Sequence, residues 1–342
     1  MVAANRPLTW TDYVAILKCK AGELGAVKSC RLDNVVPLFE VVDPRNASTK
    51  LIQAWPASSG VVWVHSLNVH NMDERPFAAA VDSLFACLET EVSAVPVITT
   101  SEPASLLSTV RSIVAAQGRG LVLRLDVEEI LEFGNALNGE VDDVLSACSV
   151  SPASVDLVVD AGLVAGTPSV RAAAVSQALQ MLPSSTTWRS LVVALSAFPI
   201  DLSSVGKGSV GELHRNDANT FDLVTGSYTV LPLTYADYAI GVPTHDQAPF
   251  PPIPNIKYTH DRMWKVHRGH ERKRPGQQYQ ALAVDLAAAQ YFATAQFSPG
   301  DHYISAVAHG HDGPGNAMTY LRAGVSHHLH VVSYRLASLG VP

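Results

Sequence analysis

The sequence has few cysteines and no long apolar run. Its four cysteines, Cys19, Cys30, Cys87 and Cys148, include no CxxC pair, which argues against a disulfide framework or a cysteine zinc site and favours a reducing compartment. No apolar stretch approaches the roughly 18 residues of a membrane span, and the first residues contain no stretch of signal-peptide length. We therefore expect a soluble, cytoplasmic protein that does not bind membranes.

Sequence signatures of several catalytic machineries are also missing. There is no GxSxG, no P-loop, and no GxGxxG after the first apolar run. A serine-hydrolase elbow, ATP hydrolysis through a P-loop and a dinucleotide-binding fold therefore lack support. Charged residues make up only 16% of the 342 residues and hydrophobic residues 47%, a composition that argues against disorder.

What the chain does contain is a repeated alternation of short apolar runs with longer, partly amphipathic stretches. The runs cover residues 13–18, 35–42, 61–67, 94–100, 120–126, 155–162, 190–198 and 234–241. Their continuous hydrophobicity is typical of strands buried on both faces, and their spacing leaves room for crossover helices. We predict a closed (β/α)8 barrel of the triosephosphate isomerase type, with a doubly wound open sheet as the alternative.

The alternation stops after the eighth run. Residues 241–254 are rich in proline, which excludes a helix or a central strand, and the partial alternation that follows predicts a hairpin. We predict one domain over residues 1–342, with a barrel core of 13–241 and an eighth helix at 277–292. An insertion at 241–276 and a C-terminal extension at 297–342, built of two strands or of a strand and a helix, should pack around one rim.

A basic segment at 257–274 stands out in an acidic chain. It holds seven Lys or Arg against two acids, although the net charge of the chain is −7. Such a patch suits the phosphates of a nucleic acid or a nucleotide, and a solvated hairpin explains it equally well. Tyr258 and Trp264 lie among the charges, where they either stack on bases or pack the inner side of the hairpin. A protein partner is a further option.

Polar residues gather at the ends of the predicted strands, where barrels of this class place their active sites. We predict Lys18, Glu40, Asp126 and Asp160 as catalytic residues and Arg124 as a binding residue. The carboxylates can act as general acid and base or hold a divalent metal ion, and Lys18 can neutralise a phosphate. Hydrolysis of a phosphodiester is the simplest reaction for this set. A buried ion-pair network is the alternative explanation.

The C-terminal region is rich in histidine. His328 and His330 would share a face of a strand and could ligate one ion together, but no flanking Cys or Glu-x-x-His supports a metal site. Histidines whose nitrogens bond to backbone groups are the commoner explanation. The cofactor is therefore unknown, with a divalent metal ion as one option.

Several segments resemble one protein family along almost the whole chain. The opening YVAILKCKAGELGAV and the following VVPLFEVV resemble the start of the phage-type beta protein family. Further similar segments are GELHRNDANTFDL, TYADYAIG, IKYTHDRMWKVHRG, SPGDHYISAVA and RAGVSHHLHVV. Ala15 and Ala236 depart from the family pattern, which often has proline and glycine there.

The resemblance implies an occurrence in phages and bacteria but no settled activity. It adds Arg268, as a phosphate or carboxylate contact, and the pair His327 and His328, packed over the barrel mouth, to the predicted binding residues. Two functions remain open from the sequence. One is a phosphodiester hydrolase or another barrel protein that acts on nucleic acid or nucleotides in phage–host conflict, including antiviral defence. The other is a non-catalytic binding protein that uses the barrel as a scaffold.

Overall fold

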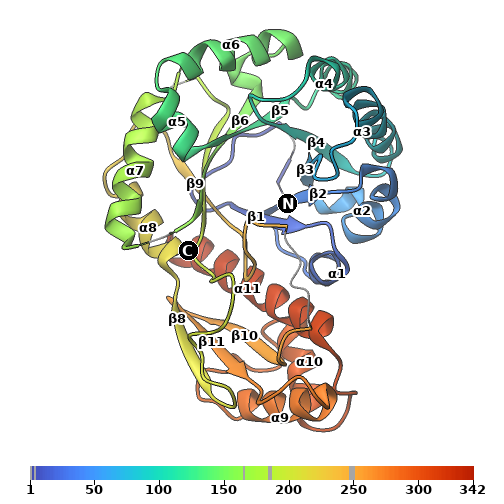
Figure 1. Ribbon diagram of the computed structural model, residues 1–342, viewed down its shortest axis with the longest axis vertical. Helices are drawn as coiled ribbons and strands as arrows, with labels where there is room; N and C mark the ends of the chain where they lie inside the picture. The colour runs from blue at the N-terminus through green and yellow to red at the C-terminus, as the bar shows by residue number, and fades with distance from the viewer. Residues whose placement is uncertain (1, 4, 165, 184–186, 246–250) are drawn as a thin grey trace.

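The computed structural model describes residues 2–3, 5–164, 166–183, 187–245 and 251–342. Residues 246–250 of the predicted proline-rich segment lie outside the described residues. Figure 1 shows a ring of strands and helices, with a smaller layer of strands and helices attached at one side.

Eight parallel strands form a closed barrel in the order β1-β2-β3-β4-β5-β6-β7-β9, and β9 pairs with β1. They are β1 (Tyr13–Lys18), β2 (Val35–Val41), β3 (Val61–Ser66), β4 (Ser93–Ile98), β5 (Leu121–Asp126), β6 (Val155–Leu163), β7 (Ser190–Ser196) and β9 (Leu233–Asp237). Each strand coincides with one of the eight apolar runs. Strand β4 lies beside β5 in parallel, with Val97 opposite Val122. The predicted closed barrel is confirmed.

Helices follow the strands and form the outer ring (Figure 1). They are α1 (Ala21–Ser29), α2 (Ser48–Ala54), α3 (Glu74–Leu88), α4 (Ala104–Gln117), α5 (Val127–Phe133), α6 (Ala136–Cys148), α7 (Pro168–Met181) and α8 (Asn216–Thr225), with 3-10 turns at Pro44–Asn46, Ala57–Ser59 and Pro152–Ser154. Helix α4 shows how such an element ends. Gly118 takes a left-handed conformation with φ 64°, and its N–H donates to the carbonyl of Val114, which satisfies one of the last carbonyls of the helix.

The barrel interior is a packed apolar core. Side chains from the strands fill it in layers, because alternate residues of each strand point inward; they include Val14, Ile16, Val36, Leu38, Trp63, Val95, Val97, Val122, Val158, Val192 and Ala236. The N-terminal segment joins this core through Val2 and Leu8. The N–H of Leu8 donates to Ser190 Oγ at 2.7 Å, and the N–H of Val61 donates to the carbonyl of Val2 at 3.0 Å.

A second, antiparallel sheet lies beside the barrel, in the order β10-β11-β8. Its strands are β8 (Val210–His214), β10 (Asn255–His260) and β11 (Met263–Arg268), and the helices α9 (Pro275–Ala287) and α10 (Pro299–Ala308) accompany it. We call these five elements the side layer. The predicted hairpin is confirmed as β10 and β11. Tyr258 and Trp264 are 0% and 1% exposed, which contradicts the alternative that they stack on bases. They pack on opposite faces of the hairpin, Tyr258 in the cluster of the side layer and Trp264 in the cluster around the barrel.

Helix α11 (Ala317–Leu339) corrects the predicted end of the chain. The predicted eighth helix exists as α9, but it packs against α10, β10 and β11 in the side layer. It is α11 that packs against α1 and β1 and stands beside the barrel wall. The strands predicted for the C-terminal extension are also wrong, since α10 and α11 are both helices.

The physical reason lies in the apolar faces of the two helices. Val325, Leu329, Val332 and Leu336, at helical spacings of three and four, belong to the core cluster around the barrel. The buried face of α9 instead joins a separate cluster inside the side layer. Helix α1 also admits α11 closely, since a Cβ added at Gly22 would lie 2.9 Å from Leu321.

Candidate functional site

Polar side chains collect inside the C-terminal end of the barrel. Glu40 comes from β2, His65 from β3, Arg124 from β5 and Asp160 from β6, and Tyr238 follows directly after β9. Each strand residue stands two positions after an apolar residue that points inward, so strand alternation directs it into the barrel as well. We call these five residues the mouth cluster.

Arg124 lies at the centre of the mouth cluster. Its Nη1 donates to Glu40 Oε1 at 2.9 Å and to His65 Nδ1 at 3.0 Å. Its Nε and Nη2 donate to Asp160 Oδ2 at 2.9 Å and 2.6 Å. Tyr238 accepts from Arg124 Nη2 and donates to Asp160 Oδ2, both at 2.5 Å. One guanidinium therefore holds Glu40 and Asp160, two of the three carboxylates that were predicted as catalytic. Neither of these two is available to a ligand without breaking this network.

The network fixes the protonation states of its members. Burial alone would raise the pKa of Glu40, but a hydrogen bond from His245 Nε2 at 3.0 Å and the charge of Arg124 outweigh it and lower that pKa to about 2. Burial, reinforced by Arg124, lowers the pKa of His65 to about 3. Near neutral pH, Glu40 stays ionised and His65 stays neutral. Neither group exchanges a proton readily, as a general acid or base must.

We expect His65 to make the protein less stable as the pH falls from neutral. A histidine in the unfolded chain has a pKa near 6.5, whereas His65 in the folded state has a pKa of about 3, so the unfolded state binds a proton first. This contribution is complete above about pH 6.5 and decreases by about 1.4 kcal/mol per pH unit down to pH 3. Glu40 adds a second loss below about pH 4.3, the pKa of an unfolded Glu.

Urea unfolding of the wild-type chain and of a His65→Gln variant between pH 7 and 4.5 measures this contribution. The variant should show a shallower slope, by about one proton. His267 and His330, whose pKa values are also lowered by burial, should keep part of the slope. A His70→Gln variant is the control, because His70 is exposed. Identical slopes in the wild type and in His65→Gln would contradict the assignment.

The remaining predicted catalytic residues do not contact Arg124. Asp126 is exposed and caps α5, where its carboxylate accepts from the N–H groups of Glu128 at 2.7 Å and Glu129 at 3.4 Å. This cap is worth about 0.5–2 kcal/mol and explains why the sequence has an aspartate there. Lys18 lies at the end of β1 and donates to the carbonyl of Thr244.

Arg268 ties two parts of the molecule together. Its guanidinium donates to the carbonyls of Leu202 and Val205, in the loop after β7. The hydrogen bonds from Arg268 to the loop carbonyls fasten β11 to the barrel. Other cations of the basic segment also contact protein groups: Arg262 pairs with Asp222, and Lys265 pairs with Glu212.

A cavity of about 250 Å³ opens beside the mouth cluster. Three lysines and two carboxylates line it, together with apolar residues: Lys18, Lys20, Lys257, Glu23 and Glu40. We call it the lysine cavity. Because Glu40 is already engaged by Arg124 and His245, the lysines dominate the charge that a ligand would meet.

Glu23 is the other acidic group of the lysine cavity. Its side chain is 8% exposed, and its buried Oε2 has no hydrogen-bond partner among the described residues. Burial raises the pKa of Glu23, although Lys18, Lys20 and Lys257 each oppose this effect. A buried carboxyl oxygen without a partner is costly, and a donor group on a ligand would satisfy it.

A larger cavity of about 460 Å³ adjoins the lysine cavity. The two cavities share Ile240, Lys257 and Leu321 as lining residues. Its walls are mainly apolar and come from the loop after β7, the side layer and α11; they include Phe198, Pro199, Ile200, Tyr279 and Tyr320. We call it the apolar cavity. We call the two adjoining cavities, which lie between the barrel mouth and the side layer, the cleft.

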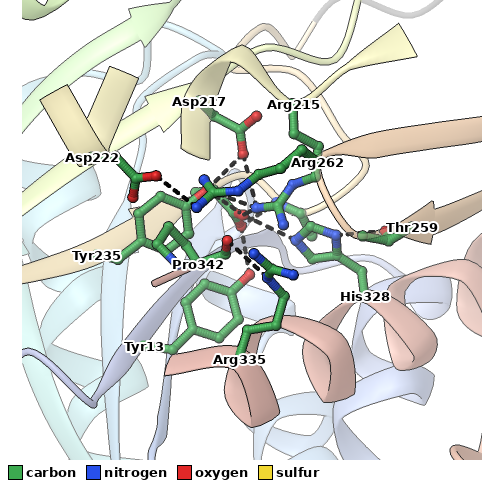
Figure 2. Close-up of polar contacts among 12 residues, drawn as sticks. Tyr13, Arg215, Asp217, Asp222, Tyr235, Thr259, Arg262, His328, Arg335 and Pro342 are labelled. Carbon is green, nitrogen blue, oxygen red and sulfur yellow. Dashed lines mark hydrogen bonds and ion pairs between the residues drawn. The ribbon is translucent and has the colours of Figure 1, made fainter. Parts of the chain in front are cut away.

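A closed polar network lies outside the barrel wall, where α8, α11 and the side layer meet (Figure 2). Asp237 accepts from Tyr13 Oη at 2.5 Å, Tyr235 Oη at 2.9 Å, His328 Nε2 at 3.0 Å and Arg215 Nη2 at 3.4 Å. We call these five residues the junction network. Their exposed fractions are 0% or 1%. The junction network therefore ties α11 and the segment between β8 and α8 to the barrel rather than meeting a ligand, and His328 continues to Thr259 of β10 in the side layer.

The predicted histidine pair lies on α11 and not over the barrel mouth. His328 reaches Asp237 on one side and Thr259 Oγ1 on the other, at 2.8 Å. His327 Nδ1 lies 2.8 Å from Asp301 Oδ2, and its Nε2 lies 2.7 Å from the carbonyl oxygen of Thr259. The ring therefore ties α11 to α10 and β10. The prediction that His328 and His330 share a face of a strand is wrong, because both residues lie on the helix α11. The predicted location of His327 and His328 over the barrel mouth is also wrong.

Metal binding finds no support in the described ranges. Within these ranges, no three or more His, Cys, Asp or Glu side chains are grouped so that they could hold a metal ion. In the mouth cluster, the oxygens of Glu40 and Asp160 that face each other bind the guanidinium of Arg124 instead. None of the described helices is both long and apolar enough to cross a membrane.

Comparison with known families agrees with the sequence resemblance. A family model described as Beta protein matches residues 13–333. The chain belongs to the Beta protein family. No curated protein matches it. The segments quoted above for the family supply the whole junction network: Tyr13 comes from the opening, Arg215, Tyr235 and Asp237 from the middle, and His328 from the closing pair.

Two solved structures are similar to parts of the chain. One is triosephosphate isomerase from Bartonella henselae, with 12% identity, a TM-score of 0.34, and coverage of 68% of this chain and 93% of that one. The other is the arginine decarboxylase of Paramecium bursaria Chlorella virus, with 10% identity, a TM-score of 0.37, and coverage of 67% and 58%. The strand pairing of this chain carries the fold assignment without them.

Proposed function

We propose that this member of the Beta protein family binds a phosphate-bearing small molecule of nucleotide size in the cleft formed by the lysine cavity and the apolar cavity. The phosphate lies beside Lys18, Lys20 and Lys257, and the base or another apolar body fills the apolar cavity. The observation that carries the proposal is that a lysine-lined cavity and an apolar one lie side by side and share Ile240, Lys257 and Leu321 as lining residues. Ligand sites commonly combine apolar walls with a few polar groups that fix orientation.

The cleft also gives the predicted basic segment a more local role. Lys257 is the cation of that segment that lines both cavities, whereas Lys273 and Arg274 are exposed at its other end. Recognition of a single nucleotide requires only the cleft. Recognition of a nucleic-acid strand would also require the exposed cations, so the two ligand classes predict different effects of replacing Lys273.

Calorimetric titration with AMP and with inorganic phosphate tests the proposal. A Lys257→Met variant should bind AMP at least about tenfold more weakly, since one charge-assisted contact contributes about 1.5–3 kcal/mol. A Lys273→Met variant, from the same basic segment, should bind like the wild type. Affinity should also fall as salt is added. Absence of binding to both ligands, or equal losses in the two variants, would refute the cleft as a phosphate site.

Hydrolysis of a bound phosphate ester is a second candidate, and one observation favours it. Glu40 and Asp160 are held by Arg124, but Glu23 lies among the lysines of the same cavity with a raised pKa. It could protonate a leaving oxygen while the lysines neutralise the phosphoryl charge. A Glu23→Gln variant that binds AMP normally but no longer cleaves a phosphodiester would support a hydrolase. A role in phage–host conflict rests on the family resemblance alone.

A further inference from the structure

Lys257 occupies an unusual environment for a lysine. Its Nζ donates to the carbonyl of Ile240 at 3.0 Å and lies 4.0 Å from the centre of the Phe198 ring. Among the described residues, no ion pair joins it to a carboxylate. Ammonium groups removed from water are normally paired with an acid. Lys257 instead faces the point where the two cavities meet.

The backbone at Lys257 is held firmly in place. Residue 257 lies inside β10, opposite Val266 of β11. On its other side, α11 approaches so closely that a Cβ added at Gly324 would lie 2.8 Å from the carbonyl oxygen of Lys257. The amine is therefore presented to the cleft from a fixed position, as covalent chemistry requires.

Burial lowers the pKa of Lys257 to about 8; Glu23 opposes this shift, and the nearby Lys18 adds to it. Part of the side chain remains accessible from the cleft, while the surrounding protein removes most of its hydration. At pH 7.5 the neutral amine is then more abundant than in an ordinary lysine, whose pKa is near 10.4, by roughly a hundredfold. Desolvation beside a second cation is one way in which proteins activate a lysine as a nucleophile.

We propose that Lys257 forms a covalent imine with the carbonyl carbon of a phosphorylated aldehyde or ketone bound in the cleft. The proposal rests on the proposed function for the phosphate contact at Lys18 and Lys20, and it names the substrate class. The phosphate lies in the lysine cavity, the carbonyl carbon lies against Lys257, and the remainder of the substrate extends into the apolar cavity.

Lys257 and Glu23 supply the electron pair and the proton that imine formation requires. The lone pair of neutral Lys257 Nζ forms a bond to the carbonyl carbon, and a proton moves from nitrogen to the former carbonyl oxygen. Glu23, in the protonated form that its burial favours, then donates its proton to that hydroxyl, which leaves as water while the C–N double bond forms. The products are a cationic imine, water and the Glu23 carboxylate. No oxidant or reductant is consumed, and the new cation lies beside the carboxylate that its formation creates.

Reductive trapping tests the imine on the full-length protein. The wild type is incubated with glycolaldehyde phosphate and cyanoborohydride at pH 7.5, and each lysine is followed by peptide mass spectrometry. Lys257 should be labelled at least about tenfold faster than Lys273, because its neutral amine is more abundant. A Lys257→Arg variant, which keeps the positive charge, should lose this label and still bind inorganic phosphate. A Lys273→Arg variant should behave like the wild type.

Two further arms separate the inference from the proposed function. Non-phosphorylated glycolaldehyde should label Lys257 more slowly, and added inorganic phosphate should protect it from glycolaldehyde phosphate. If both aldehydes label Lys257 equally and phosphate gives no protection, the imine stands and the phosphate site falls. If phosphate binds but Lys257 takes no label, or if Lys18, Lys20 and surface lysines are labelled instead, the imine is overturned.

Discussion

Replacing Arg124 by Met should destabilise the protein by about 3–5 kcal/mol, because it leaves the buried carboxylates Glu40 and Asp160 without their shared cation. Glu40 is 4% exposed and Asp160 6%, so water cannot readily take over the role of the guanidinium. The two negative charges would also repel each other across the barrel. Urea unfolding at pH 7 measures the loss.

The matched control for Arg124→Met is Arg335→Met. Arg335 pairs with Asp261; the Arg335 side chain is 15% exposed, but the Asp261 side chain is 61% exposed. Because Arg335→Met leaves its carboxylate partner in water, the loss should be about 0–1 kcal/mol. If Arg124→Met does not fold, the triple variant Arg124→Met, Glu40→Gln, Asp160→Asn keeps the test open. Removing all three charges should recover part of the stability, since replacing a whole buried ion network costs less than breaking it. A triple variant less stable than Arg124→Met would show that the charges themselves are not the cause.

The barrel was predictable from the sequence because its strands are buried on both faces. Continuous runs such as 35–42 and 190–198 have no other common explanation in a chain with regular crossover spacing. The eighth helix was not predictable in the same way. Both 277–292 and 317–339 are helical and partly apolar, and only the tertiary contacts of α1 and β1 with α11 decide which one covers the barrel wall.

The candidate site was predictable only in part. Strand ends indicated Lys18, Glu40, Arg124 and Asp160, because charged residues inside apolar runs need partners or a cavity. The sequence could not reveal that Arg124 pairs with both carboxylates, since Asp160 lies on the next strand, β6, but Glu40 lies on β2, far away in the chain. Asp126 shows the opposite error. An aspartate at a strand end can also cap a following helix, and α5 begins directly after Asp126.

Three residues of the cleft, Lys20, Glu23 and Lys257, were missed as individual site residues. Glu23 was quoted only within the family-like opening. Lys257 was counted among the cations of the basic segment. Nothing in the local sequence separates it from Lys265, which also alternates along the hairpin, yet Lys265 pairs with Glu212 at the surface.

The second large effect is expected for Asp237→Asn, which should cost about 3–5 kcal/mol and loosen the side layer. Burial alone would raise the pKa of Asp237, but the charge and hydrogen bond of His328, the charge of Arg215 and the hydrogen bond from Tyr13 lower it to about 2. Asparagine keeps the shape and removes the charge. It leaves Arg215, which is 0% exposed and has two nitrogens without partners already, with Asp217 as its remaining described anion.

The same substitution should change the acid limb of the stability curve. Aspartate in the unfolded chain has a pKa near 3.9, so the contribution of Asp237 is complete above about pH 4 and is lost as the pH falls toward 2. Asp237→Asn should therefore lose less stability than the wild type between pH 4 and 2.5, although it starts lower. Asp261→Asn, in the surface pair with Arg335, is the control and should change little.

Hydrogen exchange locates the effect of Asp237→Asn in the molecule. His328 lies on α11 and Arg215 directly precedes α8, so the amides of these two helices should exchange faster, while those of α4 on the far side of the barrel should not. A uniform increase over all helices would mean that the junction network stabilises the whole fold and not the attachment of the side layer. Unchanged exchange in α11 would show that His328 holds its position without Asp237.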